Sequence, residues 1–149
     1  MRALLQRVTR AEVRVGGGVV GRIGHGLLVL LGVGPADDEH VARDLARRIA
    51  ELRIFRDDVG RTNGSLLDVS GEALVVSQFT LWADTRRGRR PGFTGAAPPD
   101  QANALYLVFA AALADVLGHP VPTGRFGAEM EVDLVNDGPF TIWLDTADR

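Results

Sequence analysis

The residues of this 149-residue chain best suited to chemistry lie where an apolar run becomes polar. Ala73–Leu81 begins with apolar, β-branched residues, which are typical of a buried strand. It then carries a hydroxyl, an amide, an aromatic ring and a second hydroxyl, on Ser77, Gln78, Phe79 and Thr80. The polar end of a rigid strand is a common position for a binding or catalytic site. The alternative is an ordinary strand that leaves the core with its hydroxyls bonded to the backbone.

A second stretch with chemical potential is Val135–Thr141, which contains Asn-Asp-Gly-Pro. Asn-Asp-Gly between the strand patterns Glu129–Val135 and Phe140–Leu144 is typical of a hairpin turn. Pro139 adds a further constraint, because it removes a backbone donor and restricts Gly138 before it. About 5–6% of X–Pro bonds in folded proteins are cis. A cis bond here would turn two carbonyls outward, as acceptors suited to a substrate ammonium group.

The basic residues are all arginine, and their distribution says more than their number. Seventeen arginines against 19 acidic residues give a net charge of −2, so the whole chain has no overall attraction for nucleic acid. Four arginines nevertheless crowd into five positions: Arg86, Arg87, Arg89 and Arg90. A solvated loop is one interpretation. A phosphate-contacting patch is the other, because the guanidinium fork matches phosphate oxygens.

Several kinds of site are excluded or disfavoured. The absence of cysteine excludes disulfides and thiol nucleophiles, and the three scattered histidines lack a carboxylate at metal-ligand spacing, so we predict no metal and no cofactor. No Gly-x-Ser-x-Gly motif of the usual hydrolases is present. The longest apolar block, Leu27–Leu31, is far shorter than the roughly 20 residues of a membrane span. We therefore expect a cytoplasmic protein that enters no membrane.

The elements that must position these residues follow from their patterns. A hairpin is predicted for Leu4–Val15 and Val19-Val20, joined by the turn Gly16-Gly17-Gly18. A central strand is predicted for Leu27–Val33. Asp37-Asp38-Glu39 and Pro98-Pro99-Asp100 each open a helix, and Trp82–Ala97 between them is a long loop. The order predicts one domain, 1–149, of the α/β class: mixed, mainly antiparallel sheets in a layered β-β-α sandwich with two main helices on one side.

Taken together, the two chemical stretches resemble the D-aminoacyl-tRNA deacylase family, formerly called D-tyrosyl-tRNA deacylases. Ser77-Gln78-Phe79-Thr80-Leu81 and Asn136-Asp137-Gly138-Pro139-Phe140-Thr141 carry the resemblance. Further similar segments extend it nearly from end to end: Leu5-Gln6-Arg7-Val8, Gly26–Gly32, Arg90-Pro91-Gly92-Phe93 and Thr123-Gly124-Arg125-Phe126.

The resemblance implies a homodimeric enzyme that hydrolyses the ester between a D-amino acid and the 3′-terminal adenosine of tRNA, with no DNA partner. Ser77, Gln78, Phe79 and Thr80 would line the adenosine and ester pocket. Gly138 and Pro139 of the other subunit would bind the amino group and exclude an L side chain. Glycine, including glycine mischarged on tRNA-Ala, would pass. Arg7 would brace the Gly–Pro loop.

This sequence departs from the family at three positions. Phe140 stands where many members carry a smaller aliphatic residue, Trp82 where a small residue is common, and Pro98 where serine often caps the helix. Phe140 and Trp82 are large enough to reshape the wall of the pocket.

The chemistry suggests a mechanism based on positioning. An aminoacyl ester is already activated, and Thr80 is a weak nucleophile without an adjacent base. We therefore assign Thr80 to orientation and the backbone N–H groups near Phe79 and Thr80 to the oxyanion. The arginine loop Arg86–Arg90 is our candidate for the tRNA contact. The alternatives are a dimeric RNA-binding module without catalysis and, less favoured, a generic esterase.

Overall fold

A five-stranded sheet forms the centre of the computed structural model, which describes residues 1–148. Its strand order is β2-β1-β3-β6, and β7 pairs with the other edge of β1. The strands are β1 (Arg2–Val15), β2 (Gly18–Ile23), β3 (Gly26–Gly32), β6 (Glu72–Ser77) and β7 (Glu131–Asp145). Only β3 and β6 are parallel among these pairs. A separate small sheet pairs β4 (Phe55–Arg56) with β5 (Thr62–Gly64).

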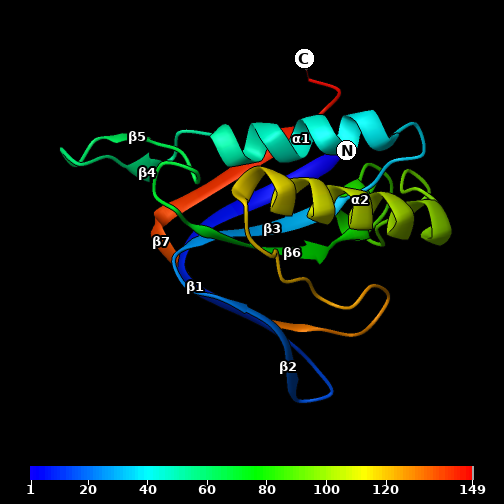
Figure 1. Cartoon of the computed structure of the whole chain (residues 1–149). Coiled ribbons are helices and arrows are strands. Elements are labelled where there is room, and N and C mark those ends of the chain that lie inside the picture. The colour runs from blue at the N-terminus through cyan, green and yellow to red at the C-terminus, as the bar shows by residue number, and fades with distance from the viewer. Residues whose placement is uncertain (149) are drawn as a thin grey trace.

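Two helices, α1 (Glu39–Glu51) and α2 (Pro99–Leu117), lie together on one side of the sheet (Figure 1). The Asp38 side chain begins α1 by accepting a hydrogen bond of 2.9 Å from Val41 N. Pro98 supplies no such bond to α2, which ends at Gly118 with a φ of 75°. Both predicted helices are confirmed, as is the β1–β2 hairpin, whose turn places Gly16 and Gly17 at positive φ.

Helix α2 has the length and apolar composition of a membrane-spanning helix. Its buried side chains explain that composition, because Leu105, Tyr106, Phe109 and Leu113 belong to the main hydrophobic cluster. That cluster also takes side chains from α1 and from the sheet. We therefore describe α2 as a core helix.

The sheet buries both of its faces, in two separate hydrophobic clusters. Along β3, Leu27, Val29 and Leu31 face the helices, whereas Leu28 and Leu30 pack in the second cluster on the opposite face. The β6 residues alternate between the same two clusters. The second cluster also includes Val13 of β1. This arrangement confirms the predicted layered α/β fold with both helices on one side.

The last part of the chain differs from the prediction. We expected two strands joined by a hairpin turn at Asn136–Pro139, but β7 runs unbroken along β1. The register places Thr141 opposite Gln6 and Asn136 opposite Val8, so the four residues 137–140 bulge opposite Arg7 alone. The hairpin interpretation is wrong.

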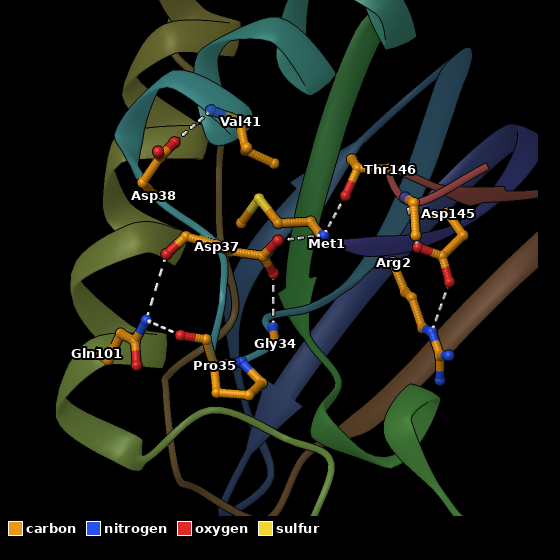
Figure 2. A network of polar contacts seen from close by, with 11 residues as sticks. Met1, Arg2, Gly34, Pro35, Asp37, Asp38, Val41, Gln101, Asp145 and Thr146 are labelled. Carbon is orange, nitrogen blue, oxygen red and sulfur yellow. Dashed lines mark hydrogen bonds and ion pairs between the residues drawn. The ribbon is translucent and has the colours of Figure 1, made fainter. Parts of the chain in front are cut away.

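The start of β1 is tied to the end of β7 by a polar network (Figure 2). The Met1 ammonium group donates to Asp37 Oδ1 at 2.5 Å and to Thr146 Oγ1. Next to it, Arg2 Nε donates to Asp145 Oδ2 at 2.8 Å. These contacts fix the position of the Arg2 side chain at the start of β1.

Candidate active site

The predicted polar strand ends earlier than expected and continues as a turn. β6 stops at Ser77, and Phe79–Trp82 form a short 3-10 helix, η1. Gln78 N still donates to Leu31 O of β3 at 2.8 Å, and the Gln78 amide donates to Thr80 Oγ1. The strand thus holds Gln78 in place while η1 exposes Phe79 and Thr80 to solvent.

The start of η1 presents backbone donors as well as side chains. The N–H groups of Phe79 and Thr80 have no acceptor among the described residues, whereas Leu81 N donates to Gln78 O at 3.2 Å. Free N–H groups are expected at the start of a helical turn. They give this turn the capacity to bind a negatively charged oxygen.

An aromatic pair joins η1 to the long loop. Phe79, 55% exposed, meets Phe93 edge to face, with ring centroids 5.0 Å apart and an interplanar angle of 71°. Such exposed aromatic surface suits stacking with a base. The loop around Phe93 therefore belongs to the same surface as Ser77–Thr80.

The second predicted segment projects from β7. Gly138 and Pro139 are exposed, the peptide bond between them is cis, and Gly138 has a φ of 120°. The Asn136 amide closes the base of the bulge, because its oxygen accepts from Phe140 N at 3.2 Å and its nitrogen donates to Thr141 Oγ1 at 3.1 Å. Asn136 belongs to the motif that carries the family resemblance, but its role in closing the bulge was not predicted from the sequence.

Arg7 supports this bulge from within the protein. Its side chain is almost fully buried and donates to Ile54 O at 2.5 Å and to Asp137 O at 3.2 Å. The guanidinium also lies 4.6 Å from the centroid of the Phe140 ring. The large residue at position 140 thus packs against Arg7.

The four clustered arginines are not equivalent. Arg86 donates to the Asp84 carboxylate at 2.7 and 2.9 Å, and these bonds hold the pKa of Asp84 well below its usual range and raise that of Arg86. Arg87, Arg89 and Arg90 are exposed, and no anionic partner lies beside them within residues 1–148. The free positive charge of the loop is therefore theirs.

The structure brings the residues of each segment together but keeps the two segments apart. No hydrogen bond, ion pair or ring contact in the described part of the chain joins residues 77–80 to residues 136–141. The arginine loop adjoins only the first of them, through η1.

Solved structures place this fold in a known class. The chain superposes on one titled c-Myc DNA Unwinding Element Binding Protein with a TM-score of 0.91 and 40% identity, covering 98% of this chain and 99% of that one. A second, titled as a probable eukaryotic D-amino acid tRNA deacylase, gives a TM-score of 0.85 at 20% identity, covering 96% and 97%. The latter similarity concerns the fold alone.

The chain belongs to the D-Tyr-tRNA(Tyr) deacylase family, whose model matches residues 4–145. Curated relatives agree. A D-aminoacyl-tRNA deacylase of Paracoccus denitrificans (strain Pd 1222) is 60% identical over 149 residues, covering 100% of this chain and 99% of the relative. One of Roseiflexus sp. (strain RS-1) is 64% identical over 147 residues, covering 99% and 94%. The resemblance is confirmed, and the chain is an enzyme of this family.

Proposed function

We propose that this enzyme hydrolyses the ester of D-aminoacyl-tRNA at sites that are each built from two copies of the chain. One copy supplies Ser77, Gln78, Phe79 and Thr80, and the other supplies Gly138 and Pro139. The enzyme acts on tRNA in the cytoplasm. Glycyl esters, including glycine mischarged on tRNA-Ala, are also substrates.

The separation of the two segments within one chain carries this proposal. Through β3, Ser77 is level with Ala3 of β1, whereas Gly138 and Pro139 lie opposite Arg7. Four residues along β1 correspond to roughly 13 Å, and the three strand spacings from β6 to β7 add roughly 14 Å across the sheet. One copy cannot bring both segments to one ester, and a symmetric dimer supplies the missing segment to each site.

The bulge is suited to screening an amino acid. Its two central residues are exposed, while Asn136 and Arg7 hold its base. Backbone carbonyls at Gly138 and Pro139 accept hydrogen bonds from the substrate ammonium group, and the backbone itself blocks the direction in which an L side chain would point. A glycyl ester has no side chain to exclude, so it enters.

Hydrolysis then depends on orientation and on the backbone of η1. As the ester carbonyl oxygen becomes negative, it accepts hydrogen bonds from the free N–H groups of Phe79 and Thr80. The Thr80 hydroxyl accepts a hydrogen bond from Gln78 and has no histidine or carboxylate beside it among the described residues. Water is therefore the attacking group, and Thr80 orients the ester.

Mixed dimers test the shared site. One variant carries Gly138→Ala and Pro139→Ala, and the other carries Gln78→Ala and Thr80→Ala. Each alone should lose most turnover of a D-aminoacyl-tRNA. If sites are shared, a 1:1 mixture that exchanges subunits regains about a quarter of wild-type turnover, since half the dimers contain one intact site. A mixture no more active than its components would contradict the proposal.

A further inference from the structure

A hollow lies directly beyond the end of the candidate ester site. Its volume is ≈ 400 Å³, and Arg2, Trp82, Thr85, Arg86 and Thr94 contribute to its lining. Arg2 Nη1 donates at 3.0 Å to the carbonyl of Leu81, the residue after Thr80, so the hollow adjoins the ester site. Cavities of about 300–1,000 Å³ are the usual size for small-molecule groups.

The floor of this hollow is a stack of flat groups. Within the lining, the Arg2 guanidinium lies 3.9 Å from the centroid of the Trp82 ring, and just outside the lining it lies 5.8 Å from that of Trp143. Asp145 holds it there, as Figure 2 shows. The Trp82 ring packs closely against Gly34, where an added Cβ would lie 2.5 Å from the ring. The position of the guanidinium is therefore fixed before any ligand binds.

The surface around this floor can stack further groups. Trp143 is 47% exposed and the Arg2 side chain 28%. Exposed aromatic rings and guanidinium planes are the groups on which bases of single-stranded nucleic acids stack, with little dependence on sequence.

Charge increases from the floor of the hollow to its rim. Arg2 and Arg86, which both line the hollow, are paired with Asp145 and Asp84, so their charges are largely balanced. The neighbouring Arg87 and Arg89 carry their charge free among the described residues. A nucleotide has the matching distribution, with a flat neutral base and an anionic phosphate.

We propose that this hollow binds the nucleotides that precede the 3′-terminal adenosine, with a base stacked against Arg2 and Trp143 and the phosphates toward the arginine loop. The inference rests on the proposed function, which places that adenosine beside Thr80. It assigns Arg2 and Trp143 to substrate binding, and Trp82 supports the floor on which Arg2 lies, whereas Thr85 lines the rim and is assigned no contact with the substrate.

Trp82 lines the hollow, Trp143 lies 5.8 Å from the Arg2 guanidinium, and the chain has no other tryptophan, so binding can be followed without catalysis. Titration with the trinucleotide CCA, which carries no amino acid, should quench tryptophan fluorescence saturably, and adenosine alone should quench it much less. Trp143→Phe should remove most of the signal. Failure of CCA to quench, or equal quenching by adenosine at equal concentration, would overturn the proposal.

Charge at the rim gives the second arm. Thr85→Glu should weaken CCA binding about tenfold by repelling the phosphates, whereas the neutral Thr85→Gln should bind within about twofold of wild type. Thr62→Glu, on β5, is the control for the added charge and should bind as wild type does. Unchanged binding by Thr85→Glu, or equal weakening by Thr62→Glu, would place the nucleotides elsewhere. Because no ester is present, these results stand even if D-aminoacyl esters prove not to be substrates.

Discussion

At the scale of single residues, the main question is what the Thr80 hydroxyl does. The sequence predicted its place in the candidate site but did not show its partner, because a hydrogen bond between Gln78 and Thr80 depends on the turn that η1 makes. The hydroxyl accepts from an amide, which cannot remove its proton. This geometry favours orientation over nucleophilic attack.

Removing that hydroxyl should therefore cost little. Thr80→Ala, and Thr80→Val as the variant that keeps the shape, should each retain turnover of D-aminoacyl-tRNA within about tenfold of wild type, in contrast to the loss of a covalent nucleophile. Single-turnover rates provide the measurement. A drop of a thousandfold or more in both variants would mean that the hydroxyl reacts chemically.

At the scale of elements, sequence patterns located most strands and helices but not their ends. The change from β6 to η1 after Ser77 could not be predicted from the stretch Ala73–Leu81, because its polar end is compatible with a strand as well as with a turn. The bulge at residues 137–140 was mistaken for a turn, because its partner Arg7 lies 130 residues earlier. Local patterns cannot show which strand a segment pairs with, and that pairing decides between a hairpin and a bulge.

The pairing of β3 with β6 leaves no room for a side chain at Gly26. A Cβ there would lie 1.8 Å from the carbonyl oxygen of Glu72, and a backbone atom cannot move aside as a side chain can. Gly26→Ala should lower the free energy of unfolding by about 3 kcal/mol or more. Gly18→Ala is the matched control, since its Cβ would lie 3.7 Å from Val15 O. Similar urea midpoints for the two variants would contradict this account.

Tyr106 joins α2 to β6, and the burial of its hydroxyl predicts that the protein loses stability at high pH. Burial raises the pKa of its hydroxyl, which donates to Val75 O at 3.1 Å. The folded state thus favours neutral tyrosine: its contribution is complete below the unfolded pKa of about 10 and disappears as pH rises through the folded value. The chain has no lysine or cysteine and one tyrosine, so no other side chain titrates near pH 10–12.

Tyr106→Phe provides the comparison. It should be about 1 kcal/mol less stable than wild type at pH 7, through loss of the hydrogen bond. Its unfolding free energy should also be flatter than that of wild type between pH 9.5 and 11.5, a range set by the tyrosine pKa. Parallel pH profiles from chemical denaturation would show that Tyr106 does not cause the alkaline loss.

At the scale of the whole molecule, the arginine loop is the candidate surface for tRNA. Replacing Arg87 and Arg89 by alanine should weaken tRNA binding and reduce the slope of log K against log salt by up to about 2. Arg47→Ala with Arg48→Ala, on the exposed side of α1, removes the same charge elsewhere and should leave the slope unchanged. An equal change in both pairs would indicate only a general charge effect.

The parts of the site differ in how much of each could be predicted from the sequence. Both motifs and the arginine cluster stood out from the sequence, since each is contiguous. The hollow beside Arg2 did not, because it joins the second residue of the chain to residues 82–95, and Trp143 near Arg2 comes from the last strand. The separation of the motifs within one copy also needed the strand register.

The central claim is that the site selects its substrate by excluding amino acids of the L configuration. The direct measurement compares hydrolysis of D-tyrosyl-, L-tyrosyl- and glycyl-tRNA by the wild-type enzyme under one set of conditions. The account predicts rapid release of D-tyrosine and of glycine, and release of L-tyrosine at least a hundredfold slower, which corresponds to about 2.7 kcal/mol. Equal rates on the two tyrosyl esters would contradict it.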